Sequence, residues 1–202
     1  MKSLAIFIFP GIQTLDLFGP IEMLGAFPDH MQLTLVAETA APVTTRHGQR
    51  IVPDATIHDG TAYDMLLIPG GDSAIDAGHR APVIDWLSST VQTADTVMTV
   101  CTGSILLAMT GALDGVRATT NKQDFRGTIH HGPNVDWVPK ARWVKDGKFY
   151  TSSGVSAGID MSLGVIADLI TPDAAEEQAI GTEYEWHRNA SWDPFAERCG
   201  LV

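Results

Sequence analysis

Short apolar runs with the length of a β-strand recur along this 202-residue chain, and segments with helical spacing follow most of them. The first run is LAIFIF (4–9), which has no polar residue on either face. Such a run is typical of a parallel strand buried on both sides, because helices cover both faces of a parallel sheet. Strands that alternate with helices in this way predict an α/β fold built on a doubly wound, mostly parallel sheet.

The sequence predicts the individual elements from periodicity and turn residues. Strands are expected at 4–9, 32–38, 64–71, 96–100 and 117–121, with hairpins at 44–57 and 141–153. Helices are expected at 15–27, 81–94, 156–170 and 174–188, and another from Cys101 to near Gly111. No repeat or linker divides the chain, so we expect one domain over residues 1–202.

Composition excludes several classes of partner. The chain has 13 basic and 24 acidic residues, and its formal net charge of −11 repels nucleic acid and anionic membrane surfaces. We expect no membrane span, because no apolar run reaches 18 residues. The two cysteines are too few for a disulfide framework, so we expect a cytoplasmic protein. The chain ends at Val202 without room for a helix-turn-helix domain, so we do not expect a transcription regulator.

Cys101 lies between a β-branched strand and an apolar helix. A residue at such a junction occupies a sharp turn above the sheet, where nucleophiles of hydrolases are found. The helix N-terminus there favours a thiolate, and Gly103 leaves room for the turn. The alternative is that Cys101 is a small core residue, as most free cysteines are. The local pattern leaves both interpretations open.

Gly70 and Gly71 end the neighbouring apolar strand. Glycines at that point allow backbone N–H groups to face a ligand, and with the N–H of Thr102 they could form an oxyanion hole beside Cys101. The alternative is a plain turn. The surrounding sequence has no phosphate-binding spacing, so we expect no nucleotide cofactor.

Asp16 follows the first strand among apolar residues. A buried acid is costly unless it is paired or protonated. Beside Cys101 it would repel a thiolate, so one of the two groups would hold a proton and Asp16 could act as a general acid. The alternative is a helix N-cap, a position that aspartate favours.

GVSAG (154–158) fits the serine hydrolase pattern, and Asp173 and His187 follow it in the order of a triad. Both lie on or between late helices, with no later strand to present the histidine. We therefore expect Ser156 to cap a helix instead. The seven histidines are scattered without metal-ligand spacing, so we expect no metal site.

Several segments together resemble the ThiJ/PfpI superfamily over nearly the whole chain, and within it most of all the isonitrile hydratases. The matching segments, in chain order, are FPGIQTLDLFGPIEML, LLIPGG, VCTGSILLAMTGALDGVRATTN, DGKFYTSSGVSAGID and the late EYEW segment. Single segments are shared with the sensor domains of transcription regulators. The combination, with its TxxLDxxGP helix start and VCTG turn, is more specific.

The resemblance implies a flavodoxin-like sandwich and a homodimer that needs no cofactor. It implies that Cys101 is the nucleophile, that Asp16 is its acidic partner and that Thr102 orients the reacting groups. Gly71 would supply an oxyanion-hole N–H. Many relatives have a histidine where this chain has Asn121, which weakens a Cys–His dyad and with it any protease or amidase activity.

The resemblance implies hydration of a small-molecule isonitrile to an N-substituted formamide, through a thioimidate on Cys101. We expect residues near Phe18 and Ile105 to hold the substituent. One alternative is a glyoxalase or deglycase that acts on 2-oxoaldehydes with the same cysteine. Another is a redox-sensing or chaperone-like dimer in which Cys101 is oxidised reversibly. The sequence leaves open whether Glu183 or Tyr184 reaches the site.

Overall fold

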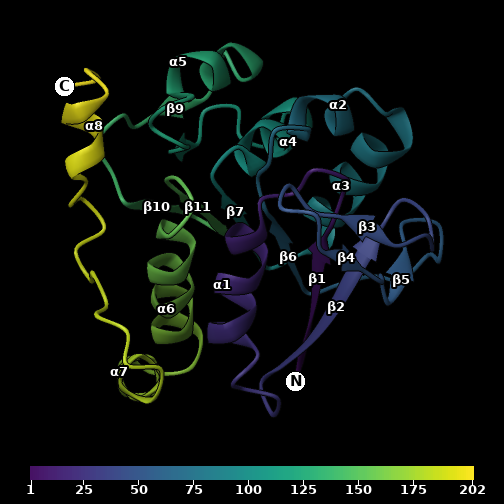
Figure 1. The fold of residues 1–202 in the computed structure, drawn as a ribbon, viewed down its shortest axis with the longest axis horizontal. Helices are drawn as coiled ribbons and strands as arrows, with labels where there is room; N and C mark the ends of the chain where they lie inside the picture. The colour runs from purple at the N-terminus through teal and green to yellow at the C-terminus, as the bar shows by residue number, and fades with distance from the viewer.

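The apolar runs form a central seven-stranded sheet in the computed structural model, which describes residues 1–202 (Figure 1). In sheet order its strands are β10 (Trp143–Asp146), β11 (Phe149–Ser152), β7 (Thr96–Val100), β6 (Met65–Ile68), β1 (Lys2–Phe7), β2 (Met31–Ala37) and β5 (Ala55–Thr56). All neighbouring pairs are parallel except the β10–β11 hairpin. The predicted doubly wound, mostly parallel α/β fold is therefore confirmed.

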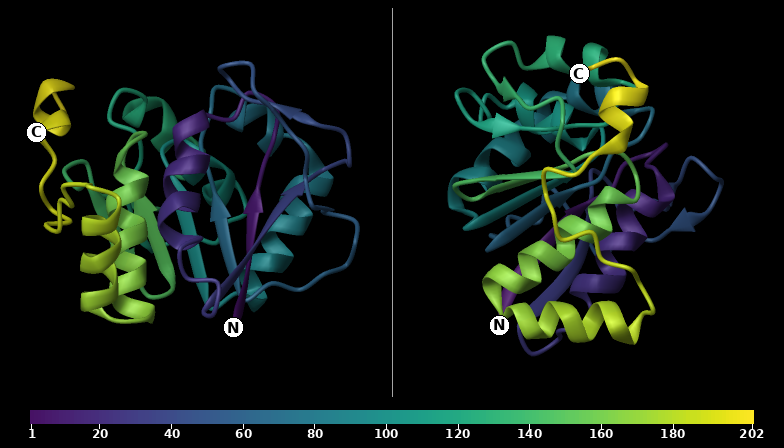
Figure 2. Two further views of the ribbon diagram at one scale, coloured as in Figure 1. Left: turned by 60° about the horizontal axis from the view of Figure 1, so that its bottom comes forward. Right: turned by 90° about the vertical axis from the view of Figure 1, so that its left-hand side faces the viewer.

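Helices cover both faces of the sheet (Figure 2). Side chains of β1 alternate between two cores, with Leu4 and Ile6 in one and Ala5 and Phe7 in the other. This alternation follows from the period of two residues along a strand. The helices of the first core are α1 (Thr14–Leu24), α6 (Ala157–Leu169) and α7 (Pro172–Gly181). Those of the second are α2 (Ala74–Gly78), α3 (Ala81–Thr93) and α4 (Gly103–Met109).

Several predicted boundaries were wrong in detail. The late helix predicted at 174–188 ends at Gly181, and residues after it run as an irregular segment in which Glu183 has a φ of 51°. The first helix ends at Leu24 instead of at residue 27, and Pro20 lies inside it. The longest helices, α3 and α6, have 13 residues each, and none of the helices could cross a bilayer.

Small elements lie outside the main sheet. The hairpin predicted at 44–57 is real but forms its own two-stranded sheet, and the predicted strand at 117–121 is only two residues long. The hairpin strands are β3 (Val43–Thr44) and β4 (Arg50–Ile51), and the second small sheet pairs β8 (Arg117–Ala118) with β9 (Asp136–Trp137). The sequence did not predict β9, α2, α5 (Phe125–Thr128), the 3₁₀ helix Ile129–His131 or α8 (Pro194–Arg198).

The C-terminal segment returns along the edge of the sheet to reach the site. After α7 the chain passes β10, where the backbone N–H of Arg142 donates to the carbonyl of Ala190 at 2.7 Å (Figure 1). It ends after α8, where the Gly200 carbonyl accepts a hydrogen bond from Arg126 of α5 at 2.8 Å. The carboxyl ends of β1, β6 and β7 meet at this end of the molecule. Ligands of doubly wound sheets bind at that edge.

Candidate functional site

Cys101 occupies the sharp turn between β7 and α4. Its φ is 56°, a left-handed conformation that costs a non-glycine residue roughly 1–2 kcal/mol. Gly103 makes the turn possible, because a Cβ there would lie 2.1 Å from the carbonyl oxygen of Ile68. Strain of this kind persists where the surrounding structure fixes one residue, often in an active site.

Asn121 donates a hydrogen bond to the Cys101 sulfur, with its Nδ2 3.0 Å from Sγ. The backbone N–H groups of Thr102 and Val155 lie near enough to lower the pKa of the thiol. Val155 has a φ of 34°, which is unusual for a β-branched residue. Donors around one sulfur stabilise negative charge that develops on it during reaction.

Asn121 is held in one orientation. Its Oδ1 accepts the backbone N–H groups of Gln123 at 2.8 Å and Asp124 at 3.2 Å, so its NH₂ group is left for Cys101. Asn121 therefore contacts the sulfur directly. An amide donates a hydrogen bond there, but it cannot carry a proton from one group to another as an imidazole can.

Asp16 is fully buried and lies against the same turn. One carboxyl oxygen, Oδ2, accepts the N–H of Gly70 at 3.0 Å, whereas Oδ1 has no hydrogen-bond partner. Gly70 permits this approach, because a Cβ there would lie 2.8 Å from Oδ2. Burial raises the pKa of Asp16 to about 7, against the opposing hydrogen bonds from Gly70 and Cys101.

Burial also raises the pKa of the Cys101 thiol to about 12, and the charge of Asp16 adds to this effect. The hydrogen bonds from Asn121, Thr102 and Val155 act in the opposite direction but are weaker. The expectation of a thiolate stabilised by the helix N-terminus was therefore wrong. Between these two pKa values Asp16 and Cys101 together retain one proton, which resides on the thiol.

Gly71 and Thr102 lie together, as expected, but the Gly71 N–H is already engaged. The Gly71 N–H donates to Thr102 Oγ1 at 2.9 Å, and that hydroxyl donates to the Gly71 carbonyl at 3.1 Å. The Thr102 N–H contacts Cys101. An oxyanion at this point would have to displace one of these contacts.

Cys101 opens into a cavity of about 630 Å³. Its size lies within the range of small-molecule sites. Ile105 lines the cavity as expected, whereas Phe18 does not and is 42% exposed on α1. The remaining lining is Gln13, Arg46, His47, Gly71, Asp72, Ala74, Ile75, Thr102, Asn121, Gln123, Asp124, Gly127, Thr128, His131 and Val155.

The other sequence candidates lie outside this cavity. The Tyr184 hydroxyl donates to Asp160 Oδ1 at 3.0 Å, so it supports α6 and does not reach Cys101. The Ser156 hydroxyl accepts from Arg142 at 3.2 Å and makes no cap hydrogen bond. The His187 ring stacks on Trp192 with centroids 4.4 Å apart. These contacts assemble no serine hydrolase triad.

Sequence reasoning missed three features of the site. It did not predict the Asn121 contact, the N–H of Val155 or the Arg46–Asp72 ion pair of 2.7 Å at the cavity wall. All three come from irregular segments, which carry no periodic signal. No three His, Cys, Asp or Glu side chains gather as a metal site would require.

A comparison with models of protein families identifies the family of this chain. The model of the DJ-1/PfpI family matches residues 2–168. This chain belongs to the DJ-1/PfpI family. Within it, the chain is 34% identical to isonitrile hydratase from Pseudomonas putida over 185 residues, which cover 90% of this chain and 78% of that protein.

A transcription regulator is also similar to this chain. The chain is 26% identical over 172 residues to the HTH-type transcriptional regulator CdhR from Pseudomonas aeruginosa, of which it covers 51%; the match covers 83% of this chain. Among solved structures, a ThiJ/PfpI family protein from Pseudomonas syringae superposes with a TM-score of 0.85 and 28% identity, covering 100% of this chain and 84% of that one.

Proposed function

We propose that this protein adds water to an isonitrile, R–N≡C, and releases the N-substituted formamide R–NH–CHO. The similarity to isonitrile hydratase supports this reaction. The observation that carries the proposal is the burial of Asp16, with a pKa of about 7, beside the Cys101 thiol.

The chemistry of an isonitrile suits this pair. Its terminal carbon carries a lone pair and is also open to nucleophilic addition, so the same atom must receive both a nucleophile and a proton. Cys101 supplies the nucleophile, and Asp16 is the acid next to it. A pKa near neutral pH allows Asp16 to take up and release a proton during one cycle.

The proposed steps balance without any other reactant. Asp16 accepts the thiol proton as Sγ bonds to the isonitrile carbon, and it returns that proton to the same carbon. The product is the thioimidate R–N=CH–S on Cys101. Water then adds to the C=N bond, and collapse of the adduct breaks the C–S bond, returns a proton to the sulfur and releases the formamide.

The hydrogen bonds around the site fit this route better than acyl transfer. The adduct formed by water is neutral, so it does not require a free oxyanion hole, and the Gly71 N–H is already donated to Thr102. Asn121 and the backbone N–H groups support the sulfur when it leaves as an anion. Thr102 orients the attacking water, and Ile105 contacts the apolar substituent.

The remaining expectations belong to the same proposal. We propose one catalytic domain over residues 1–202, which acts as a homodimer. We also propose that it works in the cytoplasm, because both cysteines are free and a reducing compartment keeps them so. The two alternative functions, a glyoxalase or deglycase and a redox-sensing or chaperone-like dimer, have weaker support. Asn121 cannot shuttle the proton that a glyoxalase moves, and Cys101, only 6% exposed with a raised pKa, is a poor peroxide sensor.

Three assays on the wild-type protein separate these functions. We expect N-benzylformamide from benzyl isonitrile, no lactate from methylglyoxal, and no added oxygen on Cys101 by intact mass after mild peroxide. Lactate production without formamide would establish the glyoxalase function instead. Reversible oxidation of Cys101 without turnover of either substrate would establish the sensor.

A further inference from the structure

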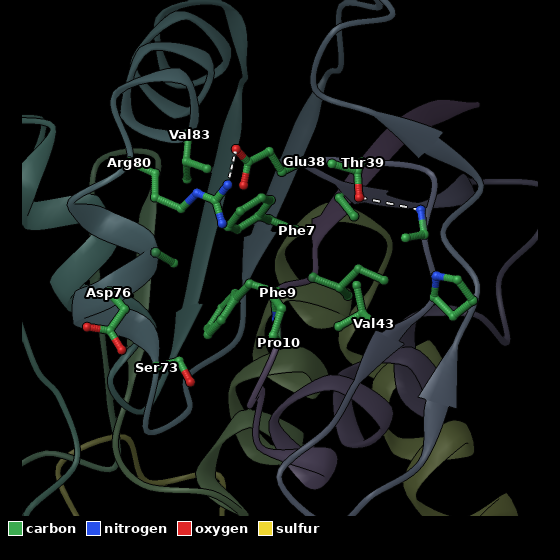
Figure 3. Close-up of a pocket in the computed structure, with 15 residues that line it drawn as sticks. Phe7, Phe9, Pro10, Glu38, Thr39, Val43, Ser73, Asp76, Arg80 and Val83 are labelled. Atoms are coloured by element: carbon green, nitrogen blue, oxygen red, sulfur yellow. Dashed lines mark hydrogen bonds and ion pairs between the residues drawn. The ribbon is translucent and has the colours of Figure 1, made fainter.

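A second cavity lies at the same edge of the sheet, away from Cys101. Its volume is about 360 Å³, within the size range of small-molecule sites. Figure 3 shows its aromatic floor, Phe7 and Phe9, whose ring centroids are 5.7 Å apart. Val43, Ala77 and Val83 complete the apolar wall, and all five side chains are at least nine-tenths buried.

An ion pair closes one side of this cavity. Arg80 Nη2 donates to Glu38 Oε1 at 2.7 Å, and the two side chains are 57% and 21% exposed. Neither side chain makes another hydrogen bond, so the pair retains free guanidinium N–H donors and a free carboxylate oxygen. In Figure 3 the pair lies beside the Phe7 ring and faces the cavity. A donor and an acceptor are therefore adjacent above an apolar floor.

We propose that this second cavity binds a secondary amide with an apolar substituent. The amide carbonyl accepts from Arg80, the amide N–H donates to Glu38, and the substituent packs on Phe7 and Phe9. A neutral amide matches both partners, whereas an ammonium ion would face Arg80 and an anion would face Glu38. Asp76 also lines the cavity, but its carboxylate points away from the aromatic floor in Figure 3.

The second cavity adjoins the candidate active site. Helix α2 separates them, since Ala74 and Ile75 line the Cys101 cavity whereas Asp76 and Ala77 line the second one. A secondary amide is also the class of product that the proposed hydration releases, so the second cavity would hold product. That link to the product rests on the proposed function, but binding of an amide does not.

Calorimetry on the Cys101→Ala protein tests the proposal, because that variant lacks the thiol and leaves the amide to bind without any reaction at Cys101. We expect N-benzylformamide to bind, and benzylamine and N-benzyl-N-methylformamide to bind at least about tenfold more weakly, since each lacks one hydrogen-bonding partner. Arg80→Met and Glu38→Gln should each weaken binding of N-benzylformamide by a similar factor. Lys2→Met, which removes the exposed Lys2–Asp95 ion pair elsewhere on the surface, should leave it unchanged.

Three results would overturn the proposal: no binding of N-benzylformamide, equal binding of the N-methylated amide, or binding that survives both Arg80→Met and Glu38→Gln. The last result would place the amide in the Cys101 cavity. Turnover of benzyl isonitrile by the wild type is measured separately. Its failure would remove the proposed function and leave amide binding as a distinct result.

Discussion

The Asp16 carboxyl and the Cys101 thiol form one titrating unit. Both are buried, and burial is the largest cause of the raised pKa of each. Because the negative charge of one group disfavours that of the other, the second proton is lost only far above neutral pH. A proton is thus stored beside the proposed nucleophile, where the proposed addition to an isonitrile carbon would require it.

The pH dependence of Cys101 alkylation tests this coupling. In the wild type we expect the rate with iodoacetamide to rise near pH 7, because loss of the Asp16 proton allows the thiol to pass its own proton to the carboxylate. Asp16→Asn should abolish that step. It should also move the high-pH step to lower pH, since the charge of Asp16 helps to raise the pKa of Cys101.

Peptide mass mapping separates alkylation of Cys101 from that of Cys199, which serves as the internal control. A step near pH 7 that persists in Asp16→Asn would show that another group controls the thiol.

The hydrogen bond from Asn121 to the Cys101 sulfur can be removed by one substitution. Asn121→Ala removes the donor 3.0 Å from Sγ, so we expect isonitrile turnover to fall about tenfold and the pKa of Cys101 to rise. Gln123→Ala is the matched control, because Gln123 lines the same cavity without a side-chain hydrogen bond to the sulfur. Equal losses in the two variants would mean that the contact has no specific effect.

The sequence predicted the positions of some site residues better than those of others. Cys101 and Gly103 were predictable from the strand–helix junction alone, because that junction fixes the turn. Asp16 needed the family resemblance, since its spacing fitted a helix cap equally well. The contact of Asn121 was not predictable, because it depends on how an irregular segment folds over the site.

At the scale of elements, α8 is joined to the site by a buried ion pair. Lys122, next to Asn121, lies 3.4 Å from Asp193 Oδ2, and the side chains are 2% and 0% exposed. Asp193 Oδ1 also caps α8 by accepting the N–H groups of Phe195 and Ala196. Burial lowers the pKa of Lys122 to about 8, although the charge of Asp193 opposes this shift.

We expect Asp193→Ala to lower the free energy of unfolding at pH 7 by roughly 3–5 kcal/mol, because it leaves the buried charge of Lys122 with its hydrogen bonds to Thr119 and Thr120 but without a counter-ion. Urea denaturation measures this loss. The loss should shrink at pH 10, since the pKa of Lys122 is below its ordinary value and the buried amine is then neutral. Asp95→Ala breaks an exposed ion pair and should cost less than about 1 kcal/mol. Equal effects of the two substitutions would contradict a structural role for the buried pair.

The long elements were predictable, and the short ones were not. The parallel strand β1 contains a continuous apolar run and β7 is rich in β-branched residues, and the Asp146-Gly147 turn predicts its hairpin. Helices α2 and α8 have five residues each, too few for an amphipathic period to show. The late helix was predicted too long because the apolar residues beyond Gly181 pack on α6 from an irregular segment.

At the scale of the whole molecule, α1 presents a face suited to self-association. Leu15 and Phe18 are 40% and 42% exposed there, while Asp16 on the same helix is buried in the site. An exposed apolar patch of this kind often marks an interface. Pairing through α1 would therefore place the dimer contact beside Asp16, the proposed catalytic acid.

Sedimentation equilibrium tests the homodimer. We expect the wild type at twice 21.7 kDa, and the double variant Leu15→Glu/Phe18→Glu at 21.7 kDa, because buried glutamates would oppose pairing. Ile180→Glu is the control, as that side chain is 67% exposed on a different helix, α7. A wild type at 21.7 kDa, or a double variant that stays paired, would rule out this interface.

The formation of N-benzylformamide from benzyl isonitrile by wild type and Cys101→Ala, compared at equal protein concentration, tests the central claim most directly. We predict that the wild type turns over and that Cys101→Ala loses at least about a thousandfold in rate, because the covalent route is removed. Cys199→Ala should retain wild-type activity. Wild-type activity in Cys101→Ala would contradict the thioimidate mechanism, and no formamide from the wild type would contradict the proposed reaction.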